Sequence, residues 1–146
     1  MNHARVLLVD DDVDDAELVI EALHRANVSA EIDVVVDGVE ALEYLSRRGR
    51  YAERLTSNPA LILLDLKMPK LDGLHVLRHL KSDDVLKRLP VVVLTSSAHE
   101  LDVLAGYNGG ANAYVVKPVD FHELVEVIVG IGRFWLVGNR PPPSAA

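Results

Sequence analysis

The sequence contains no cysteine and few aromatic residues, with one tryptophan and two phenylalanines among 146 residues. Disulfides, thiolate metal sites and a thiol nucleophile are therefore excluded, and a reducing cytosol is compatible with the chain. No apolar run approaches the roughly 20 residues that a membrane-spanning helix needs. The N-terminus also lacks the basic and then apolar segments of a signal peptide. We expect a soluble, cytoplasmic protein with no membrane segment.

Positive charge is also in short supply. Lys and Arg number 15 against 22 Asp and Glu, which gives a formal net charge of −7. Because proteins that bind nucleic acid need clustered basic residues against the phosphates, we expect no direct nucleic-acid partner. The hydrophobic share of 49% and the mean hydropathy of +0.16 are typical of a globular protein. The length suits one domain with one sizeable core.

Short aliphatic runs alternate with segments whose apolar residues recur at helical spacing. The aliphatic runs predict strands over residues 5–9, 31–36, 61–64, 91–94 and 113–116. The periodic segments predict helices over residues 12–26, 38–45, 74–82, 101–108 and 120–131. Five strands that alternate with five helices predict an α/β fold with a doubly wound parallel sheet.

Asp65 follows the most apolar of the predicted strands. Residues 61 to 64 are four consecutive large aliphatics, as in a strand that is buried on both faces. Pro69 and the Asp72-Gly73 pair then turn the chain. Ligands of open α/β sheets bind at the carboxyl ends of strands, so Asp65 is a candidate functional residue. The alternative is that it merely ends a strand.

Other predicted strands also end in groups with distinctive chemistry. Asp10 and Asp11 follow the first strand, Thr95 ends the fourth, and Lys117 follows the fifth. Two carboxylates 4 Å apart repel each other by roughly 4 kcal/mol at an effective dielectric constant near 20, so such a cluster needs a proton or a cation. Oxygen donors favour a hard ion such as Mg²⁺. Each group alone also fits a helix cap, a turn or a solvated charge, and their convergence on one edge favours a site.

The predicted cluster suits phosphoryl chemistry at Asp65. A carboxylate can act as the nucleophile that forms an aspartyl phosphate. Lys117 offers a point charge for the phosphoryl group, and the Thr95 hydroxyl can donate to one of its oxygens. Phosphoryl transfer depends mainly on positioning and on neutralising the oxygen charge that develops, which a metal ion and a lysine supply.

The sequence resembles the receiver domain of bacterial response regulators over roughly residues 4 to 132. The motifs that carry the resemblance, in the family's usual order and spacing, are Val9-Asp10-Asp11, Asp65 with Met68-Pro69 and Asp72-Gly73, Leu94-Thr95-Ser96, and Tyr114-Val115-Val116-Lys117-Pro118. The resemblance implies a flavodoxin-like (βα)5 fold with strand order 2-1-3-4-5.

The resemblance also implies roles for individual residues. Asp65 would accept a phosphoryl group from the phosphohistidine of a sensor histidine kinase. Mg²⁺ would be held by Asp10, Asp11, Asp65 and the backbone carbonyl of Lys67. The phosphoryl group would be bound by Leu66, Thr95, Ser96 and Lys117. Tyr114 would be an aromatic switch that turns inward as Thr95 moves toward the phosphate, and the Lys117–Pro118 peptide bond would be cis.

Two features depart from the commonest receivers. The polar connection over residues 47–58 is long, and the last helix ends in Phe134-Trp135-Leu136. Both resemble the single-domain regulators that are encoded with bacterial and cyanobacterial phytochromes, which implies a phytochrome-type (bacteriophytochrome) photoreceptor kinase as the partner. Lys67 lies two residues after the phosphoacceptor, a position that tunes dephosphorylation in the family.

The last predicted helix is too apolar for a single buried face. Between residues 124 and 137 the charged residues are Glu126 and Arg133. Since a surface helix should have a polar face, the excess indicates a second buried surface. We expect a symmetric homodimer through Phe134, Trp135, Leu136 and an extended C-terminal arm, with residues 1–136 as the receiver domain and residues 137–146 as the arm. The alternative is that the tail packs on its own domain.

The sequence thus predicts a stand-alone response regulator that signals by phosphorylation-dependent protein binding, since no effector domain follows residue 146. It would not be an enzyme beyond Mg²⁺-dependent self-phosphorylation and autodephosphorylation. One alternative is an Asp-nucleophile phosphohydrolase, but such enzymes usually have a second Asp at the position of Lys67. Another is a phosphorylation-independent adaptor or dimerisation module, which the retained site residues disfavour.

Overall fold

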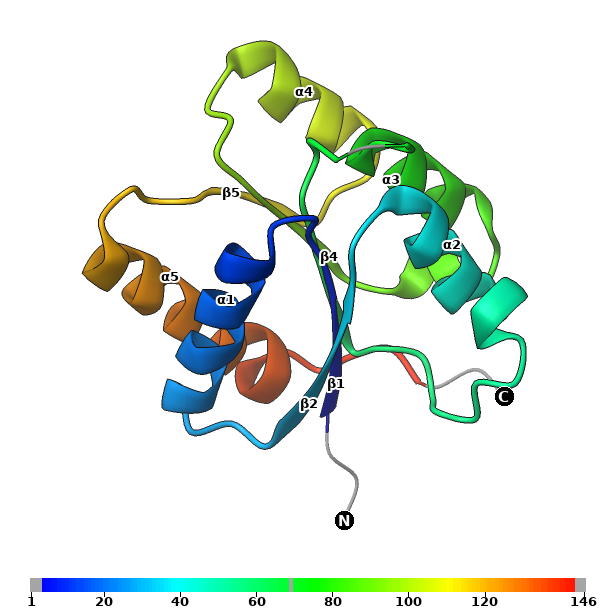
Figure 1. The fold of residues 1–146 in the computed structure, drawn as a ribbon, viewed down its shortest axis with the longest axis horizontal. Helices are drawn as coiled ribbons and strands as arrows, with labels where there is room; N and C mark the ends of the chain where they lie inside the picture. Colours follow the sequence, from blue (N-terminus) through cyan, green and yellow to red (C-terminus); the bar gives the residue numbers. More distant parts are fainter. Residues whose placement is uncertain (1–3, 69, 144–146) are drawn as a thin grey trace.

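A five-stranded parallel sheet forms the centre of the computed structural model, which describes residues 4–68 and 70–143 (Figure 1). The strands are β1 (Ala4–Val9), β2 (Ala30–Val35), β3 (Leu61–Leu64), β4 (Val91–Thr95) and β5 (Ala113–Val116). They lie in the order β2-β1-β3-β4-β5, and each neighbouring pair is parallel. The predicted flavodoxin-like topology is confirmed.

Helices cover both faces of this sheet. One face carries α1 (Val13–Arg25) and α5 (Phe121–Arg133), and the other carries α2 (Gly38–Ser46), α3 (Gly73–Ser82) and α4 (Glu100–Asn108), as Figure 1 shows. Two short 3-10 turns, η1 (Gly49–Tyr51) and η2 (Leu86–Arg88), lie in the connections. In the described part of the chain, no helix is both long and apolar enough to cross a membrane.

Successive residues of the inner strands belong to two different cores, because side chains alternate between the faces of a strand. In β1, Leu7 and Val9 pack with residues of α2 and α3, whereas Val6 and Leu8 pack with residues of α1 and α5. All four residues of β3 have no exposed side-chain surface, as the aliphatic run predicted. A central strand of this kind fixes the position of the residue that follows it.

Aspartates begin four of the helices. In each case the side chain is the N-cap and accepts a hydrogen bond from a backbone N–H of the first turn: Asp12 for α1, Asp37 for α2, Asp72 for α3 and Asp120 for α5. A cap of this kind stabilises a helix by about 1 kcal/mol. These caps fix where α1 and α3 start, close to the strand ends that precede them.

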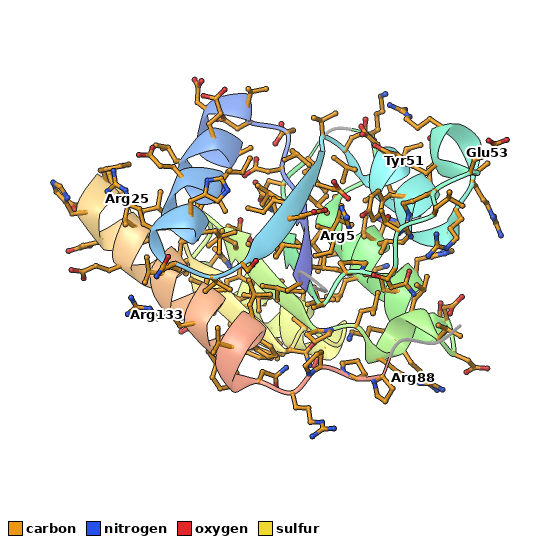
Figure 2. The ribbon with its side chains drawn as sticks, turned by 90° about the horizontal axis from the view of Figure 1, so that it is seen from below. Arg5, Arg25, Tyr51, Glu53, Arg88 and Arg133 are labelled. Atoms are coloured by element: carbon orange, nitrogen blue, oxygen red, sulfur yellow. The ribbon has the colours of Figure 1, made fainter. Side chains whose placement is uncertain are left out.

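Several side chains hold the long connection over residues 47–58 to α2. The hydroxyl of Tyr51 (labelled in Figure 2) donates to Glu40 on α2 at 2.7 Å, and Arg50 pairs with Glu40 and Glu43. The Arg54 guanidinium carbon lies 4.1 Å from the centre of the Tyr44 ring, a cation–π contact. The same guanidinium donates to the carbonyl oxygens of Tyr44, Thr56 and Ser57. The connection therefore has a defined path although its sequence has no periodicity.

Beyond α5 the chain continues through a π-helical turn, η3 (Phe134–Gly138), and the N–H of Asn139 donates to the carbonyl of Phe134. The extended segment thus begins at Asn139 and not at residue 137. Trp135 is partly buried against the α1–α5 core, whereas Phe134 and Val137 are 57% and 68% exposed. Figure 1 shows the following segment crossing from the α5 side of the sheet toward the α2 side.

Candidate functional site

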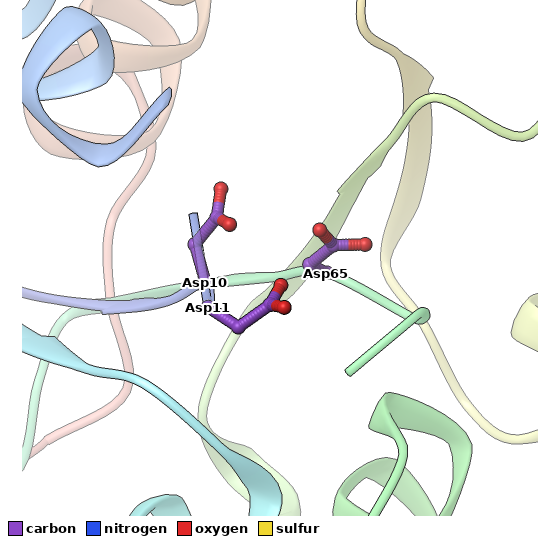
Figure 3. Close-up of side chains that lie close together, drawn as sticks. All are labelled: Asp10, Asp11 and Asp65. Atoms are coloured by element: carbon purple, nitrogen blue, oxygen red, sulfur yellow. The ribbon is translucent and has the colours of Figure 1, made fainter. Parts of the chain in front are cut away.

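Three carboxylates gather where β1 and β3 end. The two strands are adjacent, with Val9 opposite Leu64, and the N–H of Asp65 donates to the Val9 carbonyl at 3.0 Å. Asp10 and Asp65 therefore leave the sheet side by side. One carboxylate oxygen from each of Asp10, Asp11 and Asp65 lies within 4.8 Å of the others (Figure 3). The convergence predicted from the strand ends is present.

Lys117 brings a positive charge to these carboxylates from the end of β5. Its Nζ lies 3.0 Å from Asp10 Oδ2, 3.2 Å from Asp15 Oδ2 and 3.6 Å from Asp65 Oδ2. Its backbone N–H donates to the Thr95 carbonyl at 2.7 Å, which fixes its position relative to β4. The Lys117 and Asp10 side chains are only 11% and 2% exposed, so this ion pair is buried.

Burial dominates the electrostatics of that pair. It raises the pKa of Asp10, and the hydrogen bonds from the Asp12 N–H and from Lys117 oppose this only in part. Burial also lowers the pKa of Lys117, but the hydrogen bond to Asp10 and the nearby charges outweigh it and raise the pKa overall. One ammonium therefore does not fully compensate the carboxylates, and either a proton or a further cation would stabilise the site.

The other residues predicted to contact the phosphoryl group lie at the ends of β3 and β4, which are neighbours in the sheet. Thr95 has no exposed surface, and its Oγ1 accepts from the Ser97 N–H at 3.4 Å. Ser96, the residue between them, is exposed. Leu66 is buried, and its carbonyl accepts from the Gly73 N–H at 3.0 Å. Thr95 and Leu66 are thus fixed by the fold, whereas Ser96 faces solvent.

The loop after β3 is shaped by a close approach at the start of α3. A Cβ on Gly73 would lie 2.2 Å from the Asp65 carbonyl oxygen, so this position accepts only glycine without a shift of the loop. The Lys67 N–H donates to Asp65 Oδ1 at 3.1 Å. The Lys67 side chain is 68% exposed, and its Nζ lies 3.6 Å from Asp102 Oδ2 on α4.

Tyr114 lies on β5 beneath α4. Its hydroxyl donates to the Ser97 carbonyl at 2.9 Å. Its ring packs against Gly106, where an added Cβ would lie 2.9 Å from a ring carbon. The predicted switch residue is therefore linked to the turn that follows Thr95.

The Lys117–Pro118 peptide bond is trans, so the cis bond implied by the resemblance is wrong for this structure. Trans is the lower-energy form of a bond that precedes proline, by about 0.5–1 kcal/mol. In this trans geometry Lys117 reaches all three of its carboxylates.

Sequence reasoning missed two side chains at the site. Asp15 follows none of the predicted strands directly, but its carboxylate accepts a hydrogen bond from Lys117. Asp102 was not singled out, although its carboxylate accepts from the Ser97 hydroxyl and pairs with Lys67. For Asp15 a signal was present, because the first turn of a helix that starts beside a strand end faces the same edge of the sheet.

Comparisons with known proteins agree with this geometry. The family model described as the response regulator receiver domain matches residues 6–129. The response regulator Rcp1 of Synechocystis is 41% identical over 131 residues, which cover 90% of this chain and 88% of that protein. A probable methanogenesis regulatory protein, FilR2, of Methanothrix harundinacea is 36% identical and covers 96% of this chain and 88% of its own length.

Solved structures are similar over almost the whole chain. The phosphorylated cyanobacterial phytochrome response regulator RcpA has a TM-score of 0.91 and 42% identity, covering 97% of this chain and 100% of that one. The Mn²⁺-bound form of Rcp1 has a TM-score of 0.90 and 39% identity, covering 96% and 99%. The bacteriophytochrome response regulator RtBRR has a TM-score of 0.77 and 51% identity, covering 97% and 86%. The chain therefore belongs to the response regulator receiver domain family and has phytochrome response regulators among its relatives.

Proposed function

We propose that the protein is a phosphorylation-controlled signalling protein that accepts a phosphoryl group on Asp65 from the phosphohistidine of a sensor kinase. One observation carries the proposal: the Asp65 carboxylate has oxygens of Asp10 and Asp11 within 4.8 Å and the Lys117 ammonium at 3.6 Å. This arrangement supplies a nucleophile, a place for a cation and a counter-charge for the transferred group.

A divalent cation such as Mg²⁺ fits the donors that are present. Three clustered carboxylates, one of them buried with a raised pKa, are partly uncompensated, and hard oxygen donors suit Mg²⁺. Asp10, Asp11 and Asp65 would hold the ion, together with the backbone carbonyl of Lys67. When bound, the ion neutralises negative charge on the phosphoryl oxygens. A solved relative is described as Mn²⁺-bound, which supports a divalent ion here.

In the transfer step, one Asp65 carboxylate oxygen attacks phosphorus in line with the leaving nitrogen of the phosphohistidine. A P–O bond forms as the P–N bond breaks, and its electron pair stays on the imidazole, which then takes up a proton. Lys117 donates to a phosphoryl oxygen, and the Thr95 hydroxyl and the backbone at Leu66 and Ser96 complete the contacts. Attack of water on the phosphorus of the aspartyl phosphate returns the free carboxylate and inorganic phosphate.

The output is a shift between two arrangements of the β4–α4 region. Thr95 ends β4, the sheet neighbour of β3, which Asp65 follows, and the hydroxyl of Tyr114 donates to the carbonyl of Ser97, two residues after Thr95. Movement of Thr95 toward a phosphoryl group therefore alters the support of Tyr114, whose ring packs against α4. The α4 surface, with exposed Leu101, is then remodelled for a partner protein.

The kinase partner we propose is a phytochrome-type photoreceptor kinase in the cytoplasm. The support comes from two relatives of solved structure, a cyanobacterial phytochrome response regulator at 42% identity and a bacteriophytochrome response regulator at 51% identity. Apolar side chains that a kinase domain can cover lie at the rim of the site: Val13 at the start of α1 is 63% exposed, and Val119 after Lys117 is fully exposed.

We further propose a homodimer through Phe134, Trp135, Leu136 and the arm. The exposure of Phe134 on η3 supports it, since its ring stands edge to face with that of Trp135 and leaves apolar surface uncovered. Sedimentation of Phe134→Ser across a concentration series tests it, because the variant should dissociate at higher concentration than wild type. A wild type that is monomeric throughout would refute the dimer.

The experiment that tests the function uses intact mass. Protein incubated with acetyl phosphate and Mg²⁺ should gain the mass of one phosphoryl group, whereas Asp65→Asn should gain none. Chelation of the metal should abolish the gain in wild type. Absence of any adduct in wild type would refute the proposal and favour a phosphorylation-independent adaptor, and sustained turnover of phosphoesters would favour a phosphohydrolase.

A further inference from the structure

The Lys117 ammonium is shared unequally among three carboxylates. An ammonium has three N–H donors. The distance from Lys117 Nζ to the nearest carboxylate oxygen is 3.0 Å for Asp10, 3.2 Å for Asp15 and 3.6 Å for Asp65. The first two are hydrogen bonds, and the third is too long to be one. The charge is therefore drawn toward Asp10 and the first turn of α1, away from the proposed nucleophile.

Asp15 is held firmly enough to exert this pull. It lies in the first turn of α1, and its backbone N–H donates to the side chain of the N-cap residue Asp12 at 3.1 Å. Its side chain is 42% exposed, so solvent screens the attraction only in part. Lys117 is 11% exposed and has little access to water that could replace a lost carboxylate acceptor.

We propose that Asp15 is a positioning residue for phosphorylation, which holds the Lys117 ammonium back from Asp65. The 3.6 Å separation leaves the Asp65 oxygen without a direct hydrogen bond from Lys117, so its lone pairs remain free for attack on phosphorus. It also keeps the ammonium within reach of an oxygen of the incoming phosphoryl group. The inference rests on the proposed function, because it concerns how that same site is arranged.

Loss of Asp15 would redistribute the ammonium. The neighbouring acceptor with spare capacity is Asp65 Oδ2, and contraction from 3.6 Å to the usual ammonium–carboxylate distance of about 2.8 Å forms a direct bond. The nucleophilic carboxylate would then be tied to Lys117 before the donor arrives. Phosphorylation would have to break that bond, so the reaction slows without loss of the metal ligands.

Asp14 provides a matched control for Asp15. It lies in the same turn of α1, its N–H donates to the same oxygen of Asp12 at 3.0 Å, and its side chain is exposed. Within the described residues, the carboxylates in contact with Lys117 are those of Asp10, Asp15 and Asp65. Asp14→Asn and Asp15→Asn therefore remove the same charge from the same end of the same helix, and only the second removes a carboxylate that contacts Lys117.

The test measures two quantities on wild type, Asp14→Asn, Asp15→Asn and Asp15→Glu. The first is the rate of phosphorylation by acetyl phosphate at saturating Mg²⁺, and the second is the affinity for Mg²⁺ by calorimetry. We expect the rate to fall by about fivefold in Asp15→Asn, the size of one partly screened charged contact, and to stay at the wild-type level in Asp14→Asn. Asp15→Glu should recover part of the rate, and both Asn variants should bind Mg²⁺ equally.

Equal rates in the two Asn variants would refute the role of Asp15 and leave the proposed function intact. A lower Mg²⁺ affinity in Asp15→Asn than in Asp14→Asn would also refute it, because Asp15 would then act on the metal site. A wild type that takes up no phosphoryl group would refute the proposed function itself. A crystal structure of Asp15→Asn gives a measurement that does not depend on activity: Nζ of Lys117 should lie closer to Asp65 than in wild type, and an unchanged separation would contradict the proposal.

Discussion

Replacing Lys117 with methionine should destabilise the protein when no divalent ion is present. The substitution keeps an unbranched apolar side chain, one atom shorter than lysine, but leaves Asp10, which is 2% exposed, without its ammonium partner. Breaking one side of a buried ion pair costs about 3–5 kcal/mol in the free energy of unfolding. Repulsion among the carboxylates, whose oxygens lie within 4.8 Å of one another, acts in the same direction.

Proton uptake sets an upper limit on this loss. Each pH unit above the pKa adds about 1.4 kcal/mol to the free-energy cost of protonating a carboxylate. For a carboxyl with the ordinary pKa of 3.8, protonation at pH 7.5 therefore costs about 5 kcal/mol. We therefore expect a loss between about 3 and about 5 kcal/mol at this pH. A larger loss would mean that Lys117 also supports the fold by packing.

The loss should depend on pH in a defined direction. Burial already raises the pKa of Asp10, and removal of Lys117 raises it further. With a raised pKa, the folded protein binds the proton more tightly than the unfolded chain does. That stabilisation is fully present below the unfolded pKa near 3.8 and is lost as the pH rises through the folded pKa. The deficit of Lys117→Met should be small near pH 4 and largest above pH 7.

Urea unfolding in EDTA measures this directly. Wild type, Lys117→Met, Asp10→Asn and the double variant form a cycle, in which the double variant should regain most of the stability lost by Lys117→Met alone. A loss below about 1 kcal/mol at pH 7.5, the usual worth of an exposed pair, would refute the reasoning, because the pair would then behave as a solvated one. Failure of Asp10→Asn to rescue would also contradict it.

Three further substitutions test other parts of the structure. Gly73→Ala places a Cβ 2.2 Å from the Asp65 carbonyl oxygen, so the free energy of unfolding, measured by thermal unfolding, should fall by about 1–3 kcal/mol. Phosphorylation should also be slower, and wild-type values for both stability and rate would contradict the close approach. Gly106→Ala should displace the Tyr114 ring without unfolding the domain, seen as a changed near-ultraviolet circular dichroism signal at unchanged helix content. Asp37→Ala should cost about 1 kcal/mol as a lost N-cap of α2. The backbone hydrogen bond that Asp37 accepts lowers the pKa of its carboxyl. The stabilisation by this cap is therefore present above pH 3.8 and is lost as the pH falls through the folded pKa. A stability deficit of Asp37→Ala that stayed constant down to pH 2 would refute this.

The sequence predicted the site residues whose positions are set by the ends of the strands. Four aliphatic residues must form a buried strand, so the position of Asp65 at its carboxyl end was determined before any contact was known. Parallel pairing then brings Asp10, Thr95 and Lys117 to the same edge. These positions depend on the backbone, which hydrophobic patterns describe well.

Features that depend on side-chain direction were not predictable in the same way. The contact of Asp15 with Lys117 needs the starting point of α1 and the path of a long side chain, which charge counting alone does not give. Trp135 is partly buried within the π-helical turn η3, a type of turn for which the sequence has no known signal. The path of residues 47–58 depends on side-chain contacts such as the stacking of Arg54 on Tyr44 and the hydrogen bond from Tyr51 to Glu40.

The central claim is that Asp65 carries the phosphoryl group, and chemical mapping tests it most directly. Protein phosphorylated with acetyl phosphate and Mg²⁺ is reduced with borohydride, which converts an aspartyl phosphate into homoserine, and the peptides are then sequenced by mass spectrometry. The account predicts homoserine at position 65 and unmodified aspartate at positions 10 and 11. Homoserine at position 10 or 11, or its absence from position 65 in a protein that has gained a phosphoryl group, would contradict it.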